Sequence, residues 1–144
     1  SFTDSLGIYS LKGYVCPAFI IISRTAEANA VLFRKISDAM AVPEGAPEPM
    51  MNILAWMQPD SVDHQPNIVS IVIPRSKHRP DCYFKQGDEQ IIVSPGALDM
   101  AGLIITPREQ DYRKLTPKRA AEIIQECAYT LDNEQEIILL VKGG

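Results

Sequence analysis

Little in the composition of this chain points to a membrane, a nucleic acid or a secreted environment. The longest uncharged apolar run, residues 15–22, is far too short to cross a bilayer, and no basic stretch followed by an apolar core stands at the start. The formal net charge is −4, which does not favour nucleic acid or an anionic membrane surface. We therefore predict that the protein has neither nucleic-acid nor membrane partners.

Cysteine and histidine are also scarce. Cys16, Cys82 and Cys127 form no CxxC pair, and an odd number of cysteines argues against a disulfide framework or a zinc knuckle. No histidine, cysteine or acidic residues stand at a recognised metal-ligand spacing. We expect no metal and no cofactor, structural thiols in the core at Cys16 and Cys127, and a reducing, cytoplasmic location.

Length and composition predict one domain. The chain has 144 residues, of which 46% are apolar and 22% charged, as in globular domains with a core of their own. We take residues 1–144 as that domain. The chain begins with Ser1 rather than Met, and its start leads into a strand pattern without a cap or tail. This predicts a fragment of a longer protein; the alternative is a complete domain from which a tag was cleaved.

Hydrophobic patterns predict the elements of the first half. Residues 13–23 form an apolar, β-branched run typical of a buried strand, which either starts after Pro17 or bulges there. Thr25 can cap a helix over about residues 26–41. Its inward side is expected to carry Val31, Leu32, Ile36, Ala39 and Met40. Two further strands are expected at residues 50–57 and 68–75, the second buried on both faces.

The second half is expected to mix short strands with one long helix. Short strands are expected at residues 90–95 and 102–106, with a helical turn between them at 97–101. Pro117 after Thr116 predicts a helix to about Leu131, because proline at the first helical position loses no hydrogen bond. Residues 136–142 are expected to form a last strand or a docked tail.

The order of these elements predicts the fold class. The middle strands follow one another through loops without an intervening helix, which is typical of antiparallel neighbours. We therefore expect an α+β fold, an antiparallel sheet with helices packed mainly on one face.

Two segments resemble the end of a histidine-triad nucleotide-binding half. MNILAW, residues 51–56, resembles the strand that precedes the triad, and NIVSIVIPR, residues 67–75, resembles the phrase HVHFHVIPR. The three histidine positions are held here by Asn67, Val69 and Ile71. Residues 94–107 resemble the corresponding region of diadenosine tetraphosphate phosphorylases and plant GDP-galactose phosphorylases.

This resemblance implies a two-half protein. In these families, as in galactose-1-phosphate uridylyltransferase, the N-terminal half carries a histidine that becomes linked to the nucleotide, and the C-terminal half has lost it. The present chain resembles the C-terminal half. The resemblance thus implies a histidine-triad-like fold, an N-terminal catalytic half as partner, nucleotide or sugar phosphate as ligand, and the possibility of a homodimer.

Four residues are the candidates for phosphate binding. Arg75, Lys77, His78 and Arg79 form a dense basic loop after a buried strand, and arginine offers a planar donor fork for phosphate. The alternative is a solvated run of charges. A Ser-His-Asp hydrolase built from Ser94, His78 and Asp99 lacks a nucleophile-elbow pattern, so we predict no catalytic residue in this chain.

Two hypotheses for the function remain open. The first is a non-nucleophilic half that supports a catalytic half and holds substrate phosphate. The second is a catalytically decayed binding or protein-interaction module with no enzymatic role. A histidine-rich strand upstream of Ser1 would favour the first hypothesis.

Overall fold

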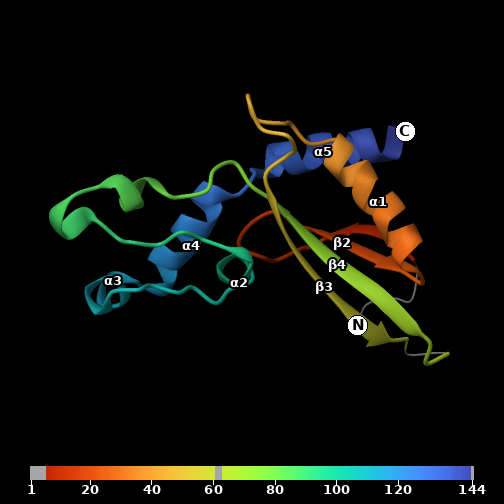
Figure 1. Cartoon of the computed structure of the whole chain (residues 1–144), viewed down its shortest axis with the longest axis horizontal. Coiled ribbons are helices and arrows are strands. Elements are labelled where there is room, and N and C mark those ends of the chain that lie inside the picture. The colour runs from red at the N-terminus through yellow and green to blue at the C-terminus, as the bar shows by residue number, and fades with distance from the viewer. Residues whose placement is uncertain (1–5, 61–62, 144) are drawn as a thin grey trace.

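A four-stranded antiparallel sheet organises the computed structural model, which describes residues 6–60 and 63–143 (Figure 1). The strand order is β1-β2-β4-β3, with bounds Gly7–Ser10 for β1, Phe19–Ser23 for β2, Met51–Pro59 for β3 and Pro66–Pro74 for β4. The α+β class is confirmed, and the finer histidine-triad-like assignment stays a prediction. Residues 1–5 and 61–62, part of the predicted chain start and of the predicted loop before β4, lie outside the described residues.

The two central strands are the most apolar segments, as the sequence predicted. Every residue of β2 is buried, and the strand starts after Pro17 rather than bulging there. Strand β2 pairs with β4 so that Phe19 faces Val72 and Ile22 faces Val69. A continuous apolar run suits this position, because a central strand packs on both of its faces.

Helix α1, Ala26–Asp38, and helix α5, Leu131–Gly143, lie on the same face of the sheet (Figure 1). The Thr25 hydroxyl accepts a hydrogen bond from the backbone N–H of Ala28, which confirms the predicted cap. The core on this face contains Phe19, Ile21, Ile36, Met40, Val72 and Ile137. Val31, predicted to face inward, is instead 50% exposed, so that part of the prediction is wrong.

The predicted last strand at residues 136–142 is also wrong, because this segment belongs to α5. Ile137, Ile138 and Val141 recur at helical spacing and pack against the sheet, while Leu139 and Leu140 stay exposed. Packing along one side of a helix therefore overrides the strand propensity of this β-branched run. Strand β1 was not predicted.

Residues 75–128 form a second part of the molecule beside the end of the sheet (Figure 1). It contains short 3₁₀ turns at Asp81–Phe84 and Gly87–Glu89 and helices α2, Ala97–Met100, α3, Glu109–Lys114, and α4, Pro117–Cys127. The predictions for α2 and for the start of α4 are confirmed, whereas α3 was missed. The predicted helix was to run to about Leu131, but α4 ends at Cys127, and Leu131 is 67% exposed and begins α5.

The predicted strands at 90–95 and 102–106 are absent from the described secondary structure. In these two segments, aspartate side chains accept hydrogen bonds from backbone N–H groups that a neighbouring strand would otherwise bind. Asp111 is fully buried, accepts a hydrogen bond from the N–H of Ile92, and receives two more from the Arg108 guanidinium. The Arg108 bonds hold the pKa of the Asp111 carboxyl below its usual range. Asp99 likewise accepts from the N–H groups of Gly96 and Ile105.

We predict that Ile36→Ala lowers the free energy of unfolding by about 2–5 kcal/mol, because it leaves a cavity between α1 and the sheet. Ile36 has no exposed surface in the structure. Val31→Ala, on the exposed side of the same helix, should cost about 0.5 kcal/mol or less. Urea titrations followed by circular dichroism measure both values, and equal losses would contradict the orientation of α1.

Candidate functional site

Arg75, the first residue of the predicted basic loop, is buried. Only 4% of its surface is exposed, and the guanidinium hydrogen-bonds to groups of its own chain. Its acceptors are the carbonyl oxygens of Cys127, Pro95, Lys77 and His78 and the side-chain oxygen of Asn52. An arginine has five N–H donors, so none is left over for a ligand. Arg75 therefore has a structural role.

The acceptors of Arg75 come from separate parts of the chain. Asn52 lies on β3, Cys127 ends α4, and Pro95 precedes α2. The distances run from 2.6 Å to Asn52 Oδ1 to 3.2 Å to the Cys127 carbonyl. One side chain thus joins the end of the sheet to the second part of the molecule.

Lys77 is held by two acids. Its ammonium lies 2.8 Å from Asp81 Oδ1 and 2.5 Å from Glu126 Oε1. Hydrogen bonds to Asp81 and Glu126 raise the pKa of the Lys77 ammonium, and the Lys77 bond lowers the pKa of the Asp81 carboxyl. The positive charge of Lys77 is therefore compensated within the chain.

His78 and Arg79 are the two members of the basic loop that face solvent. The Arg79 guanidinium lies 4.4 Å from the centre of the Tyr83 ring, and its Nε donates to Ser94 Oγ at 3.3 Å. Tyr83 in turn meets Phe84 edge to face, with ring centroids 5.1 Å apart. In the part of the chain that the structure describes, the terminal nitrogens of Arg79 have no hydrogen-bond partner. An anion can reach these terminal nitrogens, because the Arg79 side chain is exposed.

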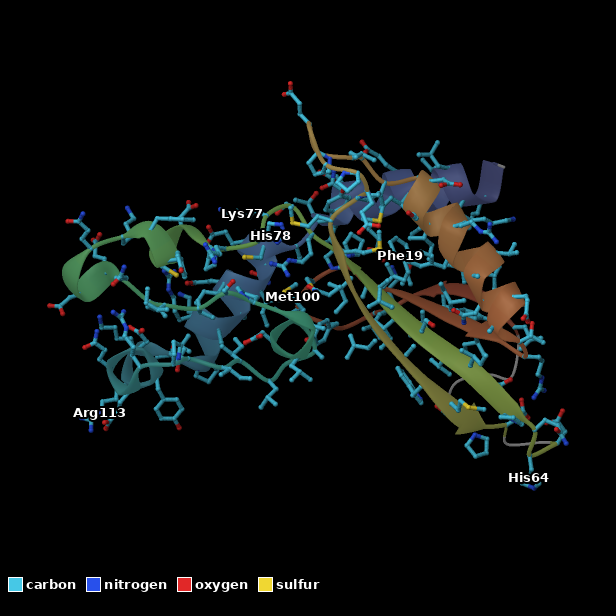
Figure 2. The ribbon with its side chains drawn as sticks, in the orientation of Figure 1. Phe19, His64, Lys77, His78, Met100 and Arg113 are labelled. Atoms are coloured by element: carbon cyan, nitrogen blue, oxygen red, sulfur yellow. The ribbon has the colours of Figure 1, made fainter. Side chains whose placement is uncertain are left out.

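The two histidines lie far apart. Figure 2 shows His64 at the tip of the β3–β4 hairpin and His78 at the other end of the sheet. His64 adopts a φ of 58°, a turn conformation. The two imidazoles therefore cannot act together on one substrate.

The three positions that correspond to the histidine triad lie on one face of β4. Asn67 is buried and donates to Asp60 Oδ2 at 3.1 Å, which ties the strand to the hairpin end. Val69 is buried among Ile20 and Ile22, and Ile71 is half-buried beside them. This face is apolar where a triad enzyme needs imidazole groups.

The other nucleophile candidates are equally poorly placed. The Ser94 hydroxyl accepts a hydrogen bond from Arg79 rather than donating its proton to a general base, and Asp99 accepts from two backbone N–H groups. Cys16, Cys82 and Cys127 are free and buried, as expected for core thiols. Burial raises the pKa of the Cys16 thiol to about 11, so it is not a thiolate at neutral pH. Residues 6–60 and 63–143 contain no serine or cysteine side chain that is hydrogen-bonded to a general base.

Sequence reasoning missed a polar cavity of about 610 Å³ beside the basic loop. Lys85, Lys114 and Arg119 line it together with acids that include Glu126 and Asp88. These cations belong to segments that are distant in the sequence, so no local sequence pattern predicted the cavity. Because the lining contains both acids and bases, its walls do not favour one sign of ligand charge.

The described residues contain neither a metal-binding cluster nor a membrane-spanning helix. No group of three or more histidine, cysteine or acidic side chains there could hold a metal ion. None of the helices described is long and apolar enough to cross a bilayer.

Known proteins provide no independent identification of this site. No protein-family model, curated protein or solved structure matches the chain.

We predict that Arg75→Ala lowers the free energy of unfolding by about 3 kcal/mol or more, because it leaves several buried acceptors unpaired. Arg75→Lys should recover only part of the loss, since an ammonium cannot copy the planar donor fork. Arg79→Ala, at the exposed end of the loop, should cost about 0.5 kcal/mol or less. Thermal and urea unfolding of the variants is the measurement, and a neutral Arg75→Ala would contradict the structural role.

Proposed function

We propose that this domain is the non-nucleophilic half of a histidine-triad-like nucleotidyltransferase or phosphorylase. It supports a separate N-terminal catalytic half and contributes a contact to the phosphate of a nucleotide or nucleotide sugar. The resemblance of residues 51–56 and 67–75 to that superfamily motivates the proposal. The observation that carries it is the apolar triad face, on which Val69 and Ile71 occupy positions where a catalytic half would need histidine.

The phosphate contact is assigned to Arg79, with His78 beside it. Within the basic loop, Arg75 forms five hydrogen bonds to its own chain, and Lys77 forms ion pairs with two acids. Arg79 retains donors at its terminal nitrogens, and Tyr83 stacks against the guanidinium at 4.4 Å. A cation of fixed orientation next to aromatic surface suits a phosphate attached to a base or sugar.

We predict that ADP shifts the backbone amide signals of residues 78–84 in NMR titrations, more strongly at low salt because exposed charges are screened. Arg79→Ala should weaken binding about fivefold, the effect of losing about 1 kcal/mol. Arg113→Ala is the matched control, because Arg113 is 75% exposed and pairs with Glu109 outside the loop. Equal effects of the two substitutions would remove Arg79 from the proposal.

We also predict that the domain alone neither turns over nor becomes labelled by phosphate-labelled dinucleoside polyphosphates or nucleotide sugars. The reason is that neither His64 nor His78 stands in an HxH spacing, and among the described residues no hydrogen bond joins either imidazole to a group that could activate it for attack on phosphorus. Mass spectrometry of the treated protein checks this expectation. A nucleotide adduct on either histidine would contradict the non-nucleophilic assignment.

A second candidate function is a protein-interaction module, and the outer edge of β3 favours it. The nine residues of β3 include no charged side chain, although charge is a common protection of sheet edges. Ile53 is 46%, Trp56 39% and Met57 68% exposed. These side chains and the unpaired backbone groups of the strand suit the addition of a further strand.

The direction of the β3 backbone groups follows from the register with β4. At the two ends of the paired stretch, the backbone N–H of Arg75 donates to the Met50 carbonyl and the backbone N–H of Asp60 donates to the Gln65 carbonyl. The backbone N–H and C=O groups of the even-numbered residues of β3 therefore point toward β4. Those of odd-numbered residues such as Ala55 point outward. Pro59, which lacks a donor, falls on the outward set, where no ladder bond is lost.

We predict for the interaction module that the domain self-associates through this edge in sedimentation experiments at rising concentration. Ala55→Pro should abolish the association while leaving the domain folded, because the removed N–H points away from β4. Leu54→Pro is the matched contrast and should unfold the hairpin, since its N–H faces β4. A monomer at all concentrations, or association that survives Ala55→Pro, would contradict self-pairing through β3.

A further inference from the structure

A cavity of about 390 Å³ lies between the β1–β2 connection and the junction of α4 and α5. The red connection in Figure 1 runs from the sheet toward this part of the molecule. Its walls include Leu11, Tyr14, Val15 and Tyr129, so much of the lining is hydrocarbon or aromatic. The size lies in the range of small-molecule sites. Neither the basic loop nor the edge of β3 contributes to it.

A buried acidic residue, Glu134, is part of the lining of this cavity. Glu134 is only 4% exposed, and its Oε1 is buried without a hydrogen-bond partner. The nearest cation is the ammonium of Lys12, which lies 3.6 Å from Oε1 on a side chain that is 76% exposed. A buried acceptor without a donor is costly, so the site lacks one close N–H group.

The position of Glu134 places it on the packed side of α5, three residues before the buried Ile137, where a carboxylate is unusual. Acidic residues in the first turn are favoured by the helix dipole, and Asp132 serves that purpose from an exposed position. An exposed carboxylate at residue 134 would gain the same dipole interaction and keep its hydration. A hydrocarbon side chain would fill this packed position at lower cost, so the choice of an acid at residue 134 needs a separate reason, and a ligand donor supplies it.

The chemistry of the cavity selects the ligand. An anion or a phosphate would meet the negative charge of Glu134 without water to screen it. A neutral alcohol could donate one hydrogen bond but would leave the carboxylate charge uncompensated. A primary ammonium supplies both donor and charge, its hydrocarbon chain can contact Leu11 and Val15, and the tyrosine rings suit a neighbouring cation.

We propose that this cavity binds a small ligand with a primary ammonium group on an apolar body, and that Glu134 is its counter-ion. Lys12 occupies the mouth of the site in the absence of ligand and is displaced into solvent when the ligand ammonium enters. This binding function is independent of the proposed phosphate contact, which involves the opposite charge and different residues. Free amines and a lysine side chain of a partner protein share this chemistry.

The test is an NMR titration of the whole domain with n-pentylammonium chloride, followed at the amides of residues 12–16 and 130–134. The uncharged analogue 1-pentanol and the anion pentanoate serve as ligand controls. We expect saturable shifts with pentylammonium, at least tenfold weaker binding of pentanol, and none of pentanoate. A blocked lysine, Nα-acetyl-lysine methylamide, tests the peptide source, and its binding in place of pentylammonium would assign the site to a partner's lysine. Absence of saturable shifts with both amines, or equal binding of pentanol, would overturn the proposal and leave a hydrated carboxylate.

Three variants separate this proposal from a structural role of Glu134. Glu134→Gln should weaken pentylammonium binding at least tenfold, and Asp132→Asn, in the same helical turn, should leave it unchanged. Lys12→Ala should tighten binding severalfold, because it removes the competing cation, and the exposed position of Lys12 makes this variant independent of any folding defect at Glu134. Unchanged or weaker binding by Lys12→Ala would overturn the proposed exchange of cations.

Discussion

The buried guanidinium of Arg75 is the interaction on which the arrangement of this molecule depends. It holds the end of β4 against β3, the end of α4 and the segment before α2. All its partners are neutral oxygens, and no carboxylate of the described residues lies within ion-pair distance of it. Because the Lys77 and His78 carbonyls belong to this network, Arg75 also fixes the loop that follows. Lys77 then meets Glu126, and Arg79 turns to solvent.

The two parts joined by Arg75 are stabilised in different ways. The sheet relies on backbone pairing and apolar packing against α1 and α5, as a continuous run of β-branched residues requires. The second part has little regular structure, and buried aspartates replace a neighbouring strand. Asp99 and Asp111 each accept hydrogen bonds from backbone N–H groups of extended segments. Because these acceptors are held in place by their hydrogen bonds, the irregular segments keep a defined shape.

The surfaces available for binding differ in chemistry. Arg79 offers a stacked cation, the cavity at Glu134 offers a buried anion within an apolar wall, and β3 offers an uncharged backbone edge. In the described residues the three thiols are buried and the two histidines lie far apart. The exposed Arg79 is the reason for proposing a supporting half with a phosphate contact. The uncharged edge of β3 is the reason for the second candidate, an interaction module.

The sequence by itself determined the elements whose hydrophobic pattern is local. The runs at β2 and β4, the Thr25 and Thr116 caps and the α+β class follow from neighbouring residues along the chain. Tertiary structure decided the rest. A run such as residues 136–142 fits a strand or a helix equally well until one side of it packs on the sheet. In the sequence, the candidate site was a cluster of four basic residues. Only the fold showed which of them have acceptors within the chain and which face solvent. Arg75 bonds to the Cys127 carbonyl and Lys77 pairs with Glu126, and no local sequence pattern predicts these distant partners.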